Sequence, residues 1–156
     1  MQTGLEALVA AARSLLLDDS VIATVPVSNG DAEHNDPLPY ILTNFYATHA
    51  VYNLGPNELY RQFRGEFRVC APRDRGMATA EPLKSAIFTR FTDTIGGHTP
   101  QYRLNAYLSP NWASDIILEA GVGEIPPYID YVGKDTDPAT ARYNTGVQFE
   151  FRIHRI

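Results

Sequence analysis

The stretch LYRQFRGEFRVCA, residues 59 to 71, decides the fold, because apolar and polar side chains alternate along it. One side of this stretch carries the uncharged positions Phe63, Gly65, Phe67 and Val69. The other side carries the polar positions Gln62, Arg64, Glu66 and Arg68. A period of two is typical of a half-buried antiparallel strand. We therefore expect one side to be covered by the core and the other to face water or a partner.

The last segment of the chain repeats this alternation. Its apolar positions are Val147, Phe149, Phe151 and Ile153. The polar positions between and after them are Gln148, Glu150, Arg152 and His154. Two strands of this kind predict one sheet whose apolar face is closed by helices.

Two helices are expected. The residues Thr3-Gly4-Leu5-Glu6 form a capping box, and apolar residues at helical spacing follow it as far as the acid pair Asp18-Asp19. A second helix is predicted over residues 79–95, with Pro82 in its first turn and Gly96-Gly97 at its end. Both helices carry an apolar stripe, which we interpret as a face packed on the sheet.

The remaining segments predict further strands and the loops between them. Strands are expected at 38–46, 102–108 and about 143–153, with loops at 28–39 and 47–58. Residues 112–118 and 128–132 have weaker strand patterns, broken by Pro126-Pro127 and the run 133–138, so about 109–142 is expected to be an extended insert. The expected fold class is α+β: a mainly antiparallel (mixed) sheet of four or more strands with two helices packed on one face, in a single domain over 1–156.

Composition indicates a folded chain that works outside membranes. The 156 residues are 44% hydrophobic and 20% charged, which is typical of a globular domain, and the net charge of −5 weighs against nucleic acid as the main partner. A single cysteine, Cys70, excludes an internal disulfide framework and is interpreted as a structural thiol. No apolar run reaches the roughly 20 residues that cross a bilayer, and the N-terminus lacks a basic region, so we expect synthesis and assembly in the cytoplasm.

The sequence offers no catalytic, cofactor or metal motif. Histidines stand singly, without an H-x-x-x-H pair or a second cysteine, which weighs against zinc; they are His34, His49, His98 and His154. There is no G-x-S-x-G elbow or P-loop, and Gly121-Val122-Gly123 lacks the third glycine of a dinucleotide fingerprint. We expect no catalytic residue, no cofactor and no metal ion, and interpret the protein as one that acts by assembly, not as an enzyme.

Two other functions stay open on the residues alone. An RNA-binding face could be built from the basic and aromatic positions Tyr60, Arg61, Arg64, Arg68 and Arg73, although Glu58 and Glu66 dilute it. A small enzyme could use an acid–histidine pair near His49 or His98. A steep salt dependence of RNA affinity would support the first, and a strongly shifted histidine pKa the second.

The order of these segments resembles the tail-terminator (tail-completion) proteins of long-tailed bacteriophages. The matching parts are a first amphipathic helix, a strand introduced by LPYIL, a long arginine-bearing strand ending at APR, a second helix and two closing strands. They correspond to residues 5–17, 38–42, 60–73, 79–95, 102–108 and 147–153. The resemblance covers most of the chain as a pattern of elements, and the stretch 111–141 is longer than the family pattern.

The resemblance implies a virion structural protein that forms a hexameric ring on the phage tail. The ring would cap the tail tube, end its polymerisation and offer a surface to the head or neck. Implied partners are other copies of the chain, the tail tube protein and neck or connector proteins, while DNA passes through the lumen only in transit. The alternative within this class is a neck or head–tail connector protein, either an adaptor or a stopper.

A ring also suggests which residues form the contacts between subunits or with partners. Exposed aromatic residues and arginines enrich the centres of interfaces. The candidate interface residues are Tyr46, Tyr52, Leu54, Arg64, Arg68, Trp112, Tyr128 and Tyr131. Arg64 and Arg68 are expected to pair with acids of a neighbouring subunit.

Overall fold

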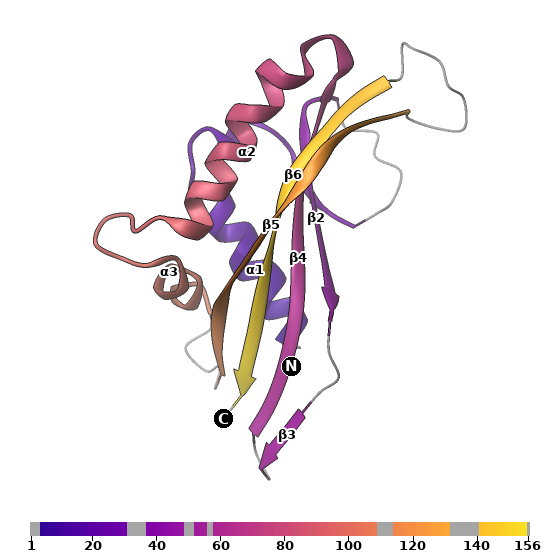
Figure 1. The fold of residues 1–156 in the computed structure, drawn as a ribbon. Coiled ribbons are helices and arrows are strands. Elements are labelled where there is room, and N and C mark those ends of the chain that lie inside the picture. Colours follow the sequence, from indigo (N-terminus) through magenta and orange to yellow (C-terminus); the bar gives the residue numbers. More distant parts are fainter. Residues whose placement is uncertain are drawn as a thin grey trace.

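A mixed six-stranded sheet forms the centre of the structure, with helices on one of its faces (Figure 1). The computed structural model describes residues 4–30, 37–48, 52–55, 58–108, 114–131 and 141–155. The strand order is β1-β2-β4-β6-β5, and β3 pairs with β4 beyond the end of β2. The expected α+β class and mainly antiparallel sheet are confirmed.

The two alternating segments are the central strands. β4 spans Glu58–Pro72 and β6 spans Ala141–Arg155, and they pair antiparallel from Leu59↔Arg155 to Pro72↔Arg142. β4's Phe63 and Phe67 are at most 1% exposed, whereas the polar positions between them are half-buried. The period of two therefore predicted correctly which side of these strands enters the core.

Shorter strands extend the sheet on the side of β4 opposite β6. β2 (Tyr40–Ala47) pairs antiparallel with β4, and β1 (Val27–Asn29) pairs parallel with β2. β3 (Tyr52–Gly55) forms a hairpin with the first residues of β4. β3 and all but the first residue of β1 fall in segments that the sequence predicted as loops, because three or four residues are too few to show a periodicity.

The predicted strand 102–108 is wrong: this segment forms helix α3 (Pro100–Ala106). Thr99 caps the helix, since its side-chain oxygen accepts a hydrogen bond from the backbone N–H of Tyr102 at 3.2 Å, and Pro100 occupies the first turn. Leu104 is buried, while Tyr102 is 58% exposed. Alternation over so few residues is also compatible with helical spacing, and the cap and the proline favour the helix.

β5 (Ser114–Tyr131) lies within the stretch expected to be an insert and forms the edge of the sheet beside β6. Its register shifts between Glu119 and Val122, and again between Ile125 and Tyr128. The second shift contains Pro126 and Pro127, which lack the N–H that a regular ladder needs and are tolerated at an edge. The two weak strand predictions in this stretch are thus one long strand with two irregularities.

Helices α1 (Gly4–Leu17) and α2 (Gly76–Thr92) cover the apolar face (Figure 1). The proposed capping residue Thr3 lies outside the described residues. α2 follows a short helical turn η2 (Arg73–Arg75) and begins three residues earlier than predicted, so Pro82 lies in its interior. Gly76 permits this start, since a Cβ there would lie 2.4 Å from the side chain of Tyr143.

Five phenylalanines join the sheet to α2. The ring of Phe67 lies 4.7 Å from that of Phe91, centroid to centroid, and 5.7 Å from that of Phe45. Phe91 also contacts the rings of Phe149 and Phe151, at 4.9 and 5.8 Å. Such edge-to-face and offset contacts add to the burial of apolar area, so this cluster is the centre of the core.

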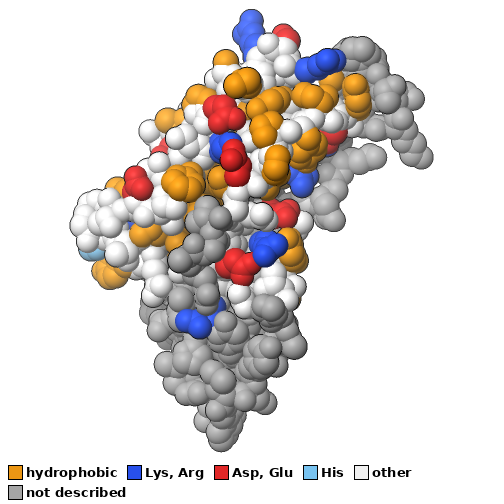
Figure 2. Space-filling view, viewed as in Figure 1, with side chains coloured by type: hydrophobic (Ala, Val, Ile, Leu, Met, Phe, Trp, Pro, Cys, Tyr) orange, Lys and Arg blue, Asp and Glu red, His pale blue; other side chains and the backbone are white. Residues whose placement is uncertain are grey.

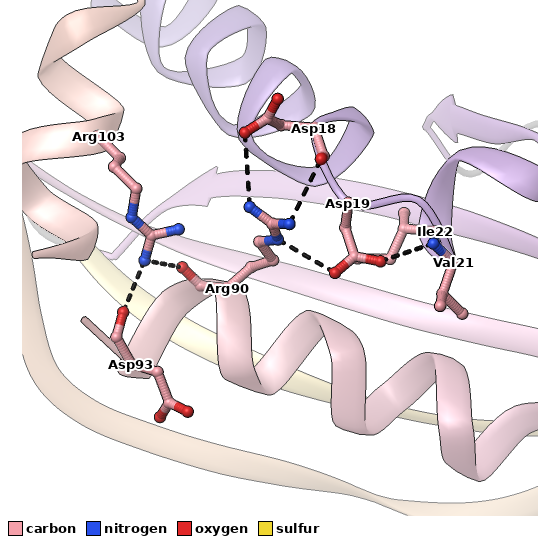
Figure 3. A network of polar contacts seen from close by, with 7 residues as sticks. All are labelled: Asp18, Asp19, Val21, Ile22, Arg90, Asp93 and Arg103. Atoms are coloured by element: carbon pink, nitrogen blue, oxygen red, sulfur yellow. Dashed lines mark hydrogen bonds and ion pairs between the residues drawn. The ribbon is translucent and has the colours of Figure 1, made fainter. Parts of the chain in front are cut away.

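A polar network joins α1, α2 and α3 at one end of the helical layer (Figure 3). Asp19 accepts hydrogen bonds from the backbone N–H groups of Val21 and Ile22, at 2.8 and 3.1 Å. Arg90 on α2 donates to Asp19 at 3.2 Å and also lies 3.5 Å from Asp18. The acid pair Asp18-Asp19, at the end of α1, thus binds α2.

Arg103 on α3 completes this network. Its Nη2 donates to the backbone carbonyl oxygens of Arg90 and Asp93, at 3.0 and 2.7 Å. The last carbonyls of a helix lack partners within the helix, so Arg103 stabilises the C-terminal end of α2. The network fixes α3 beside the two larger helices.

Candidate assembly surface

The sheet face opposite the helices carries rows of polar and aromatic side chains, which we call the outer face. It includes Arg64, Glu66 and Arg68 of β4, because their neighbours in sequence point into the core. The strand register sets Tyr46 of β2 beside Arg64, and Glu150 of β6 on its other side. The outer face therefore follows directly from the alternation that places the phenylalanines inside.

Arg64 forms the main charge contact across the outer face. Its Nε and Nη2 both donate to Oε1 of Glu150, at 3.1 and 2.6 Å, and Gln62 donates to the other carboxylate oxygen at 2.6 Å. We expected Arg64 to meet an acid of a neighbouring subunit, but its acid partner lies on the adjacent strand of its own chain. With 39% of its side chain exposed, Arg64 still reaches the surface.

Arg68 and Tyr46 contact the same carboxylate, Glu66. The Tyr46 hydroxyl donates to Glu66 at 3.1 Å, and Nη2 of Arg68 lies 4.0 Å from it. The guanidinium of Arg68 also lies 5.7 Å from the ring centroid of Tyr128 on β5, close enough for a cation–π contact. Acid and base are thus interspersed on the outer face, a different pattern from the basic stripe that typically tracks a nucleic-acid backbone.

One end of the outer face holds a partly buried polar cluster. Asp130 on β5 accepts two hydrogen bonds from Arg142 on β6, at 2.6 and 2.8 Å, and one from Asn144 at 2.8 Å. Arg142 also donates to the hydroxyl of Tyr40, and the Cys70 thiol donates to Asn144 at 3.0 Å. Burial raises the pKa of the Cys70 thiol to about 11, which makes this cysteine a structural group.

This cluster predicts a specific dependence of stability on pH. Burial raises the pKa of Asp130, but the hydrogen bonds from Arg142 and Asn144 outweigh it, so the net pKa lies below the usual 3.8. A carboxyl whose pKa is lowered by folding stabilises the folded state above its unfolded pKa, and this stability is lost as pH falls through the folded pKa. We expect urea midpoints of the wild type to fall below about pH 4 more steeply than those of Asp130→Asn.

The comparison is made by urea unfolding at several pH values between neutral and strongly acidic. The variant should be less stable than wild type at neutral pH, and the two midpoints should converge in acid. Parallel curves at all pH values would show that Asp130 has the same pKa in both states. Asp19, which also has a lowered pKa, remains in both proteins and does not affect the difference between them.

The predicted interface residues divide into three groups. Tyr46, Arg64, Arg68 and Tyr128 lie on the outer face, and Tyr131 ends β5 in a half-buried position. Tyr52 and Leu54 belong to β3, but their side chains are outside the described part of the structure, as is the whole of Trp112. Their assignment to an interface stays a prediction.

The described residues show no arrangement of side chains that supports the enzyme alternative. His98 stacks on Tyr102, with ring centroids 4.4 Å apart, and His34 and His49 fall outside the described residues. Within the described ranges, no three His, Cys, Asp or Glu residues are grouped so that they could hold a metal ion. None of the helices in these ranges is long and apolar enough to span a membrane.

Sequence reasoning missed a hollow beside α2. It has a volume of about 310 Å³ and lies between α2, β5 and β6. Phe88 borders it and is 43% exposed, because it lies off the buried stripe of Leu83, Ile87 and Phe91. An aromatic residue beside the core stripe of a helix was the available signal.

The comparisons with known proteins give a distant structural likeness only. No protein-family model matches the chain, and no curated protein matches it. A solved chain from a structure titled "Virion of native gene transfer agent (GTA) particle" aligns over 94% of this chain and 92% of that chain, with a TM-score of 0.48 and 19% identity.

Proposed function

We propose that this protein is a structural component of a phage-like virion. In the more specific form of the proposal, copies assemble side by side into a hexameric ring that caps the tail tube. The ring stops tube polymerisation and offers its other side to head or neck proteins. The support is the order of elements, in which β5 takes the place of the closing strand expected at 102–108, together with the shape of the folded chain.

The polar outer face and the projecting strands support the proposal. Helices α1 and α2 cover one face of the sheet, while the lower ends of β4 and β3 extend past both helices (Figure 1). The chain thus forms a plate with one helical side, one polar side and a protruding end. A plate of this kind presents different surfaces to its two neighbours, and heterologous contacts between such surfaces close into a ring when the rotation allows it.

A ring whose two faces differ can end the growth of a tube. A tube grows because each added layer presents the surface that the next layer binds. A ring that binds this surface, and presents a different one on its far side, ends growth without any covalent step. The partnered arginines of the outer face also suit a lumen through which DNA moves, because phosphate is held most strongly by cations without acidic partners.

A tube-growth assay tests the proposal. Purified tail tube protein is polymerised with and without this protein, and tube lengths are measured in negative-stain images. We expect tubes to stop growing and to carry a ring at one end. Gln101→Ala, on the exposed side of α3, serves as a folded control that caps like wild type. Unchanged growth and bare tube ends at saturating protein would contradict capping, and binding to a portal complex instead would indicate a connector.

A further inference from the structure

We propose that the hollow between α2 and β5 receives the turn at residues 73–77 of a second copy of this chain. This inference rests on the proposed ring and names one contact that would build it. Residues of α2, β5 and β6 line the hollow: Glu81, Lys84, Phe88, Gly123, Glu124 and Val147. In Figure 2, hydrophobic side chains gather over α2 and the adjoining strands, with acidic and basic groups among them.

The rim of the hollow is acidic. Glu81 and Glu124 have 40% and 62% of their side chains exposed, whereas Lys84 between them is only 15% exposed. The Lys84 ammonium lies 3.5 Å from Glu81, donates to Glu124 and also reaches the hydroxyl of Thr145. Two carboxylates and one ammonium leave one negative charge at the rim.

The floor of the hollow is apolar. Val147 is 3% exposed and belongs to the core, and the ring of Phe88 stands at the side with 43% of its surface exposed. A volume of about 310 Å³ holds several water molecules, which an apolar side chain would displace. The site therefore favours a segment with an apolar side chain flanked by positive charge.

The turn that precedes α2 has this chemistry. Arg73 and Arg75 are exposed and flank Asp74, which gives the turn one net positive charge. No ion pair of either arginine is found within the described part of the chain. Met77, two residues after Arg75 and in the first turn of α2, is 68% exposed. Methionine is flexible and fits irregular apolar hollows, so the turn complements the hollow in charge and in shape.

The Met77 side chain cannot reach the Phe88 side of the hollow in its own chain. Met77 and Phe88 both belong to α2, and eleven residues of helix separate them by about 16 Å. A contact between turn and hollow therefore joins two copies, and it uses a different surface on each. That is the heterologous geometry a ring requires.

Cysteine cross-linking tests the contact directly. Met77→Cys and Phe88→Cys are made singly and together, and the natural Cys70 is retained because it is fully buried. After mild oxidation, alone and with tube ends present, we expect a mixture of the two single variants to give a covalent dimer. Each single variant alone should give none. The double variant should give a ladder of oligomers, since the two positions in one chain are too far apart to pair.

Two controls make the result specific. Tyr107→Cys is on an exposed residue outside both surfaces, so its mixture with Phe88→Cys should give no dimer. Adding Glu124→Arg to the double variant should reduce cross-linking at least tenfold, and Arg75→Glu should restore it. Two results would overturn the inference: no cross-link in a protein that forms rings, or a ladder that stops at the dimer. The absence of a cross-link in a ring-forming protein leaves the proposed ring function intact. Cross-links in a protein that forms no rings and caps no tubes would count against that function.

Discussion

Replacing Phe67 by alanine is expected to cost about 3–5 kcal/mol of folding free energy. Phe67 is fully buried on β4 and contacts three other rings, of which Phe91 belongs to α2 and the other two to the sheet. Removing the ring leaves a cavity where the helical layer meets the sheet. Since domains are stable by only about 5–15 kcal/mol, this change removes a large share of the total.

Urea unfolding followed by circular dichroism measures this loss. The matched control is Phe88→Ala, which removes the same ring from a position on α2 that is 43% exposed. We expect the control to cost about 1 kcal/mol or less, because half-exposed rings bury less apolar area. Equal losses in the two variants would contradict the placement of Phe67 at the centre of the core.

Replacing Gly146 by alanine is expected to cost at least about 3 kcal/mol. A Cβ at this position would lie 2.2 Å from the backbone carbonyl oxygen of Phe67 and 3.1 Å from Cα of Arg68. Both groups belong to the backbone of β4, which cannot move aside without breaking its pairing with β6. We expect a lower urea midpoint and faster amide hydrogen exchange along β4 and β6 than in wild type.

Gly65→Ala provides the contrast for this prediction. Its Cβ would also be crowded, at 2.6 Å from Phe45 and 2.8 Å from Phe151, but both close atoms are at the ends of side-chain rings. Rings can shift where a strand backbone cannot, so the expected cost is smaller, about 1–3 kcal/mol. A larger loss in Gly65→Ala than in Gly146→Ala would show that the β4–β6 contact is looser than described.

The sequence predicted the elements whose pattern is long. The alternation over residues 62–69 identified β4, and that over residues 147–154 identified β6, including which side of each strand is buried. Short elements were missed or misassigned, because a few alternating residues also fit a helix: the segment 102–108 became α3 once Thr99 and Pro100 had fixed its start. β5 was divided in two because its irregularities interrupt the period.

The candidate surface was predictable only in part. Alternation predicts that Arg64 and Arg68 lie opposite the core, and the structure shows this. The partner of Arg64 depends on the register between β4 and β6, which the sequence does not specify, so Glu150 of the same chain was not foreseen. The hollow beside Phe88 depends on how α2 packs against β5, two elements far apart in the chain, and no local pattern reveals such a contact.

The mass of the assembled protein tests the central claim most directly. Light scattering over a range of concentrations, alone and with tail tube protein, gives the mass, and negative-stain images of the same samples give the shape. Assembly from different surfaces of each plate predicts closed rings of one size, with an open centre, at least when tube ends are present. A species that stays monomeric or dimeric at every concentration, with and without tubes, would contradict the claim.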